Sequence, residues 1–394
     1  MSFNVHLKED AEEAMESIGV SPEGMEIMAR KGKMYFIKLE SVPLKDAIIL
    51  KQEALAVGGD CAVSWGVVGL TTDKTDALLI ITERQVEILV KKMRFQPFNG
   101  RRIAEELEKT LLNNGKGKYI FRAGDKEIEL PTAIMGILNI TPDSFSDGGK
   151  YYGAEKAVER AMQMVEEGAD IIDLGGESSR PGSPRISSEE ELNRVMPVLK
   201  ELRDRTDVPI SVDTYKPEVA DRVLSAGADI INDIYGLRKE GMAETIADHG
   251  AGAVIMHMRG DPENMQKNPE YGDVIGDIIG FLRIQSEKAL DTGVSRDSIM
   301  VDPGIGFGKS LEHNLKIVRE LGSFRSLGYP VLFGASRKSF IGAALDLPVE
   351  ERLEASLATT SLAVLKGAST IRVHDVRETV RAVRMVEAIM GSVR

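Results

Sequence analysis

The sequence is poor in cysteine and in long apolar runs, and each shortage excludes a class of protein. Cys61 is the one cysteine among 394 residues, which excludes an intrachain disulfide framework and a thiolate zinc cluster. No apolar run approaches the roughly 18 residues of a membrane span. The acidic start, MSFNVHLKEDAEEAMES, also lacks the charged-then-apolar order of a signal peptide. We therefore expect a cytoplasmic protein that does not bind membranes.

Positive charge is also in short supply. The chain has 50 Lys and Arg against 62 Asp and Glu, a formal net charge of −12. A protein that neutralises the phosphates of a duplex needs a broad basic face, so nucleic acid is not an expected partner. A small anionic substrate remains possible, because it requires only a few cations collected at one site.

The order of apolar and amphipathic segments predicts two domains. Beyond residue 115, eight apolar segments alternate with helical patterns such as 154–168, 188–204, 216–227 and 352–367. Eight repeats in about 260 residues favour a closed (β/α)₈ TIM barrel over residues 116–394. Residues 119–130, two short strands around a Gly-Asp turn, are expected to form a hairpin that closes the bottom of the barrel. The eight candidate strands are 133–140, 170–176, 209–214, 229–234, 253–258, 299–304, 330–336 and 369–376.

Residues 1–115 predict a small α/β accessory domain, to which the sequence assigns no chemistry. Its candidate strands are 33–40 and 76–82, and its candidate helices are 44–59, 83–94 and 100–113. Cys61 lies in an apolar run and is expected to be a buried hydrophobe. The single tryptophan, Trp65, is expected to serve packing.

The most informative stretch is MGILNITPDSFSDGG, residues 135–149, in which an apolar strand pattern opens into small polar residues. Asn139 at the end of the strand, and Asp143 and Asp147 beyond it, offer hard oxygen ligands for Mg²⁺. Such a loop suits an anionic, metal-bound substrate.

Further polar residues follow the other candidate strands, where barrel enzymes carry their chemistry. Asn232 and Ile234 lie two residues apart, on one face of a strand, and so do Met256 and Met258 and Arg372 and His374. Asp173 and Asp233 are placed one residue off the inward register. The strand ends also carry ESSRPGSPR (177–185, here called the acceptor loop), Asp213, DPGIGFGK (302–309) and GASRKS (334–339).

These segments together resemble the dihydropteroate synthase family, whose members join a pterin pyrophosphate to an aminobenzoate, and the resemblance covers residues from about 117 to 394. It implies that the pterin is held by Asp213, Asn232, Asp302 and Lys338 in a pocket walled by Ile234, Met256 and Phe307. It also implies that Asn139, Arg372 and His374 bind the pyrophosphate. The implied acceptor site is lined by Ser179, Arg180, Pro181, Ser336 and Lys338.

The resemblance further implies the reaction and its cofactor. Mg²⁺, Arg372 and His374 would help pyrophosphate to leave, and Asp147 and Asp213 would stabilise the residual pterin-methylene cation. Barrels of this family commonly pair, so a homodimer is expected.

Three alternatives remain open from the sequence. The acceptor loop reads ESSRPG where the family pattern has ESTRPG, so a ribosylated aryl amine is an alternative acceptor to 4-aminobenzoate. A pterin-dependent methyltransferase would share the barrel and the pterin-holding Asp and Asn, but it needs no pyrophosphate site. A non-catalytic pterin-binding barrel would have no need of the cations, acceptor loop and metal loop together.

Overall fold

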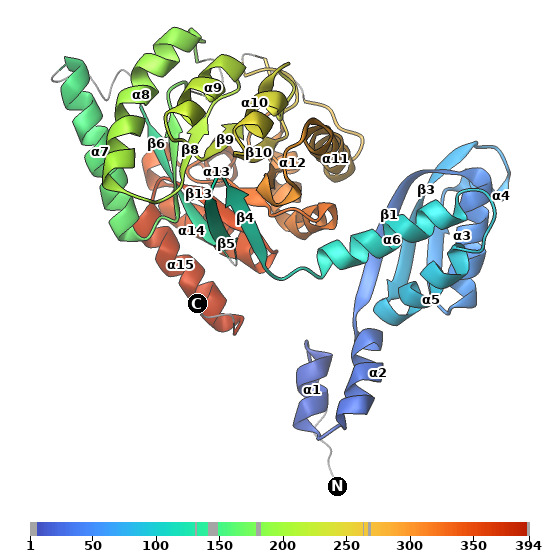
Figure 1. Ribbon diagram of the computed structural model, residues 1–394. Helices are drawn as coiled ribbons and strands as arrows, with labels where there is room; N and C mark the ends of the chain where they lie inside the picture. Colours follow the sequence, from blue (N-terminus) through green and yellow to red (C-terminus); the bar gives the residue numbers. More distant parts are fainter. Residues whose placement is uncertain are drawn as a thin grey trace. The chain divides into compact units, whose positions relative to one another are not determined.

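The computed structural model of the protein describes residues 6–130, 132–140, 149–178, 183–262, 264–266 and 269–391. The chain forms two compact units, residues 1–112 and 113–394, which are described separately below (Figure 1). Within the described residues, no helix combines the length and apolar character needed to cross a membrane.

The first unit is a three-stranded antiparallel sheet, in the order β1-β3-β2, packed against helices (Figure 1). Strand β3 alternates strictly, so that Ala77, Leu79 and Ile81 are buried while the residues between them are exposed. The predicted α/β character and both predicted strands are confirmed. The elements are α1 Ala11–Ser17, α2 Pro22–Gly32, β1 Met34–Pro43, α3 Leu44–Ala56, β2 Asp60–Val63, α4 Trp65–Val68, β3 Lys74–Thr82, α5 Glu83–Met93 and α6 Gly100–Asn114.

Two single residues of this unit were assigned from sequence, with different outcomes. Cys61 is fully buried, as predicted. The assignment of Trp65 to packing is wrong, because this side chain is 86% exposed. Trp65 begins the four-residue helix α4, in which Val67 is the buried residue.

The second unit is a closed parallel barrel whose strands are covered by helices (Figure 1). The strands run in the order β11-β10-β9-β8-β7-β6-β13-β12, and a parallel bridge between Val301 and Val331 joins β11 to β12. The predicted (β/α)₈ barrel is thereby confirmed. Its strands are β6 Ala133–Asn139, β7 Ile171–Gly175, β8 Ile210–Asp213, β9 Ile230–Asp233, β10 Gly252–Met256, β11 Ile299–Asp302, β12 Leu332–Phe333 and β13 Thr370–Val373. Its α-helices are α7 Gly149–Glu167, α8 Ser188–Arg205, α9 Pro217–Ser225, α10 Met242–Asp248, α11 Val274–Thr292, α12 Leu311–Arg319, α13 Ser339–Leu345, α14 Leu353–Leu365 and α15 Val376–Ile389.

The bottom of the barrel is closed by the predicted hairpin, β4 (Tyr119–Ala123) and β5 (Lys126–Leu130). Gly124 supplies the positive φ, 63°, that this tight turn requires. Phe121 is completely buried among side chains that point into the barrel from its strands, including Met135, Ile171 and Met300. The hairpin therefore fills the amino-terminal end of the barrel with apolar side chains.

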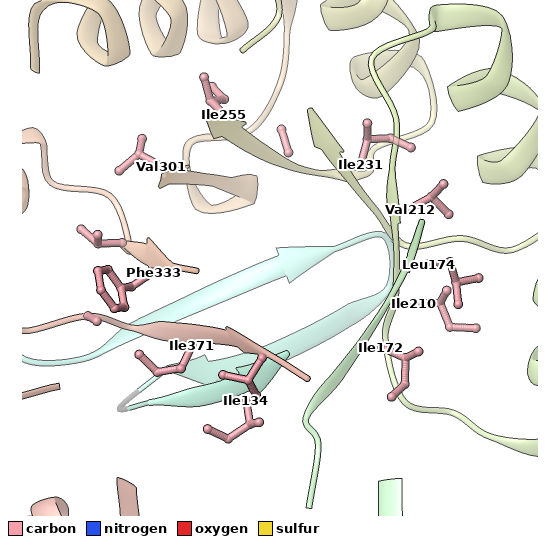
Figure 2. Close-up of a cluster of buried hydrophobic side chains, with 14 of the residues drawn as sticks. Ile134, Ile172, Leu174, Ile210, Val212, Ile231, Ile255, Val301, Phe333 and Ile371 are labelled. Carbon is pink, nitrogen blue, oxygen red and sulfur yellow. The ribbon is translucent and has the colours of Figure 1, made fainter. Parts of the chain in front are cut away.

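Alternation along the strands decides which residues face the helices and which face the barrel interior. Ile172, Leu174, Ile231 and Ile255 belong to the apolar layer on the outer side of the strands, which Figure 2 shows. Residues of the opposite phase, such as Ile171, point inward. Asp173 has the phase of Ile171, so its predicted placement off the inward register is wrong.

A candidate active site at the carboxyl ends of the barrel strands

The centre of the site is a guanidinium held between two carboxylates from other strands. Arg372 of β13 donates from Nε to Asp173 Oδ2 of β7 at 2.6 Å, and from Nη2 to Asp213 Oδ2 of β8 at 2.8 Å. Asn232 of β9 donates its amide to Asp173 Oδ2 at 3.3 Å. Four strands thus meet in one hydrogen-bonded group, three of whose members were predicted as site residues. The fourth member, Asp173, had been placed off the inward register from the sequence.

The group contains two carboxylates but only one cation, and it is buried. Both features determine its protonation. Burial raises the pKa of Asp213 to about 7, against the opposing effect of Arg372, and the neighbouring Asp173 raises it further. Burial alone would lower the pKa of Arg372, but Asp173 and Asp213 together raise it. The guanidinium is therefore permanently charged, and Asp213 is poised to change its protonation near neutral pH.

A second pair of opposite charges lies beside the first. Burial raises the pKa of Asp302 at the end of β11, and Lys338 opposes that effect. Burial lowers the pKa of Lys338 to about 8, and Asp302 opposes it in turn. Asp302 Oδ1 accepts the N–H of Gly304 at 2.6 Å. Lys338 Nζ donates to the carbonyl oxygen of Ile305 and lies 4.5 Å from the centre of the Phe307 ring.

The apolar wall predicted from sequence is present as one buried cluster. It contains the three predicted residues, Ile234, Met256 and Phe307, together with two tyrosines whose rings lie 4.5 Å apart. The full cluster is Tyr215, Ile234, Tyr235, Met256, Met258, Met265 and Phe307. An apolar wall beside paired polar groups is the usual composition of a site for a planar, hydrogen-bonding ligand.

Ser336 and His374 form a further pair at the ends of β12 and β13. The hydroxyl of Ser336 lies 3.1 Å from His374 Nδ1, and it accepts the backbone N–H of His374 at 3.3 Å. The structure therefore brings a residue predicted for the pyrophosphate beside one predicted for the acceptor.

The Gly-rich loop after β11 contains a buried amine that the sequence analysis did not single out. Lys309 Nζ lies 3.0 Å from His257 Nδ1 and donates to the carbonyl oxygens of His257 and Phe307 at 3.2 and 2.9 Å. Burial, aided by Lys309, lowers the pKa of His257 to about 2, so the imidazole is neutral. The Gly-Lys sequence at 308–309 is the one local signal that could have indicated a buried lysine in this loop.

Some of the predicted site residues fall outside the described residues: Asp143, Asp147, Ser179, Arg180 and Pro181. Asn139, predicted as a metal ligand, is the exposed last residue of β6. Among the described residues, no group of three or more His, Cys, Asp or Glu side chains could hold a metal ion. A magnesium site built on Asn139 thus needs oxygen ligands from elsewhere.

Comparison with known proteins adds independent information. Residues 135–374 match the family model described as "Pterin binding enzyme". The chain is 46% identical to a Clostridium beijerinckii protein named dihydropteroate synthase over 273 residues, which are 68% of this chain and 99% of that protein. A crystal structure of Burkholderia cenocepacia dihydropteroate synthase complexed with 7,8-dihydropteroate matches with a TM-score of 0.64 and 41% identity. It covers 70% of this chain and 97% of that one.

A further relative extends the likeness beyond the barrel. A Halobacterium salinarum protein, named probable bifunctional folylpolyglutamate synthase/dihydropteroate synthase, is 41% identical over 382 residues. The match takes in 96% of this chain but only 46% of the relative. Most of residues 1–112 therefore have a counterpart in that protein.

The barrel, its inward polar residues and the match over residues 135–374 define the class of protein: the chain belongs to the pterin binding enzymes. A relative at 46% identity is covered almost completely by this chain. Within that class, the chain is a member of the dihydropteroate synthase family.

Proposed function

We propose that the chain is a transferase that condenses 6-hydroxymethyl-7,8-dihydropterin pyrophosphate with 4-aminobenzoate and releases pyrophosphate. The observation that carries the proposal is the convergence of Asp213, Asn232, Asp302 and Lys338 beside one apolar cluster in a barrel of this family.

The pterin contacts follow from hydrogen-bonding chemistry. A pterin edge presents a ring N–H beside an amino group, and an ionised carboxylate can accept both. Asp302 suits this role, because Lys338 and Gly304 both favour its charged form. Asn232 and Lys338 would serve the remaining pterin nitrogens and carbonyl, and Ile234, Met256 and Phe307 would contact the ring faces.

The pyrophosphate contacts are assigned to Asn139, Arg372 and His374. Arg372 uses Nε and Nη2 for the two aspartates, and Nη1 makes no hydrogen bond to the described residues. That nitrogen is suited to a phosphate oxygen. The carboxylates keep the guanidinium from turning, so its charge is directed before the substrate arrives.

A magnesium ion fits the donor chemistry of the site. Mg²⁺ commonly takes few protein ligands and completes its shell with water and substrate phosphates. Asn139, with Asp143 and Asp147, would supply the protein oxygens. When bound, the ion would neutralise charge on the leaving pyrophosphate.

The proposed substitution is dissociative. Arg372 and His374 stabilise charge as it develops on the departing pyrophosphate, and the residual pterin-methylene cation is stabilised by Asp147 and Asp213. An arylamine is nucleophilic when neutral, so the reaction requires no strong general base. The proximity of Asp213 to Arg372 keeps this carboxylate available in its charged form above its pKa of about 7.

The acceptor site is assigned to Ser179, Arg180, Pro181, Ser336 and Lys338. The product named in the Burkholderia cenocepacia structure, 7,8-dihydropteroate, contains the 4-aminobenzoate group, which favours that acceptor over a ribosylated aryl amine. Competition between the two amines at limiting pterin pyrophosphate, with the products separated by mass, tests the choice. A predominance of ribosylated product would overturn it.

Loss of His374 tests the proposed reaction directly. His374→Ala should raise the activation free energy of the chemical step by about 2–4 kcal/mol. The affinity for the free pterin should stay unchanged. Pyrophosphate release and calorimetry measure the two quantities. His249→Ala is a matched control, since that imidazole pairs with Asp221, away from the site. An Arg372→Ala variant is less informative, because it leaves Asp173 and Asp213 buried without their cation.

The same assay separates the remaining alternatives. Transfer of a methyl group from methyltetrahydrofolate to a corrinoid protein, without pyrophosphate release, would identify a methyltransferase. Absence of turnover with both substrates and Mg²⁺ would favour a non-catalytic pterin-binding barrel. A homodimer and a cytoplasmic location are parts of the same proposal, supported by the family resemblance.

A further inference from the structure

The acceptor loop is fastened at its base, where its two ends lie together. Lys216 Nζ donates to Glu177 Oε2, at the start of the loop, at 2.6 Å. It also donates to the carbonyl oxygen of Ile186, directly after the loop, at 2.8 Å. Ser178 and Ser183 approach one another at 2.9 Å between their hydroxyl oxygens. The two arms of the loop, residues 177–178 and 183–185, are therefore held together at their base.

The lysine that closes the base has a third partner and is buried. Its third donor goes to Glu191 Oε2 of α8 at 2.6 Å, so all three N–H groups of the ammonium are used. The side chains of Lys216, Glu177 and Glu191 are 11%, 12% and 1% exposed. A buried ion group with every donor satisfied is rigid, because each partner has only one favourable position.

A second connection runs from the same loop to the apolar wall. Tyr215 donates its hydroxyl to Glu177 Oε1 at 3.0 Å, which ties the first arm. Arg185 in the second arm donates from Nη2 to the hydroxyl of Tyr235 at 3.1 Å. The two rings lie 4.5 Å apart at an interplanar angle of 30°. Both arms are thus attached to one pair of stacked rings.

The stacked rings are also part of the apolar cluster that we assign to the pterin. Tyr215 and Tyr235 are buried there with Met256 and Phe307. Burial raises the pKa of Tyr235 to about 12 and raises that of Tyr215 as well. Both phenols therefore remain neutral around pH 7, and Tyr215 remains a hydrogen-bond donor to Glu177.

We propose that Tyr215 and Tyr235 are positioning residues that hold the two arms, residues 177–178 and 183–185, beside the apolar cluster assigned to the pterin, and thereby determine the affinity for the aminobenzoate. The inference rests on the proposed synthase function and deepens it. Neither hydroxyl is required to contact a substrate. Each holds one arm of the loop, and the ring pair fixes both arms relative to the wall that the pterin contacts.

The test removes the hydroxyl groups and keeps the rings. Tyr215→Phe and Tyr235→Phe should each raise the KM for 4-aminobenzoate, about tenfold for Tyr215→Phe, because its bond is to a charged acceptor. The KM for the pterin pyrophosphate and the value of kcat should stay within about twofold. The double variant should raise the KM for 4-aminobenzoate by less than the product of the two single increases, because both bonds position the same loop.

A matched control lies at the bottom of the barrel. Tyr329 also accepts a hydrogen bond from an arginine, Arg296 Nη1, at 3.2 Å. Tyr329→Phe should leave both KM values unchanged. Equal rises in both KM values for the Tyr215 and Tyr235 variants would indicate general loosening and overturn the inference, as would no change at all. Failure of the proposed function is distinguishable, because the wild-type protein would then form no dihydropteroate.

Discussion

Asp302 is a buried carboxylate with one oxygen already committed to the protein. Oδ1 accepts the N–H of Gly304 at 2.6 Å, and an asparagine at this position can keep that bond with its carbonyl oxygen. Its amino group would then present donors to the donors of the pterin. Asp302→Asn should therefore weaken pterin binding by roughly 1–3 kcal/mol, measured by calorimetry with the free pterin.

The control for this change is a second buried aspartate at the opposite end of the barrel. Asp229 pairs with Lys126 and accepts the N–H of Ile210, just before β9 begins. Asp229→Asn should lower stability without changing the affinity for the pterin. Unchanged affinity in a folded Asp302→Asn variant would remove Asp302 from the pocket.

Asp213 gives a prediction about stability and pH. Its pKa is raised from 3.8 to about 7 in the folded protein, so between these values the folded state binds more protons than the unfolded state. Stability due to this group must then fall as pH rises from about 4 to about 7. The free energies of unfolding of the wild type and of Asp213→Asn, measured with denaturant, should differ by an amount that changes across this pH window and levels off above it. A constant difference would mean that Asp213 is ionised throughout.

The residues at strand ends could be predicted from sequence where the strand ends in a polar side chain. Asp213, Asn232 and Asp302 are of this kind, and each lies near the end of its strand. Asp173 was placed in the wrong register because the next inward position on β7 is Gly175, whose lack of a side chain hides the inward phase of the strand. Its ion pair with Arg372 joins residues 199 positions apart, which no local pattern indicates.

Among the elements, the Gly-rich loop after β11 depends on one close backbone approach. Gly304 has a φ of 70°, and a Cβ added there would lie 1.9 Å from the carbonyl oxygen of His257. Gly250 has a similar φ of 60°, but a Cβ there would meet nothing within 4 Å. Gly250→Ala should cost about 1–2 kcal/mol of stability from the left-handed backbone alone.

Gly304→Ala should cost about 1–3 kcal/mol more than Gly250→Ala, because the loop must move to accommodate the methyl group. It should also weaken pterin binding, since Asp302 Oδ1 is bonded to the N–H of Gly304 and Phe307 lies in the same loop. Thermal unfolding and calorimetry measure the two effects. Equal costs for both variants would show that the loop adapts freely.

Element boundaries were predictable where burial is continuous. The runs of β6 and β7 are buried along almost their whole length, as expected for parallel strands covered on both faces. Strand β12 is only Leu332–Phe333, although 330–336 was predicted, because its regular pairing with β13 extends over two positions. The exposure of the Trp65 side chain could not be predicted, since a helix of four residues has too few positions to show which face is buried.

For the whole molecule, the division into two compact units predicts that the second is self-sufficient. A fragment beginning at Asn113 retains the hairpin, all eight barrel strands and the hydrogen bond from Asn113 to the carbonyl oxygen of Ser326 at 2.9 Å. This fragment should fold cooperatively and retain synthase activity, as measured by thermal unfolding and pyrophosphate release. An insoluble or inactive fragment would mean that residues 1–112 support the barrel or complete its site.

The ion group around Arg372 also has a consequence for the time course of biosynthesis. Asp173 and Asp213 precede their cation by 199 and 159 residues. At about 5–20 residues per second, the ribosome makes the first aspartate some 10–40 seconds before the arginine. During that interval the two carboxylates have no guanidinium between them, and β6 has no β13 to pair with through Met135 and Arg372. A nascent chain therefore completes this ion group in one late event, and a product of translation interrupted before Arg372 keeps the two carboxylates without their cation.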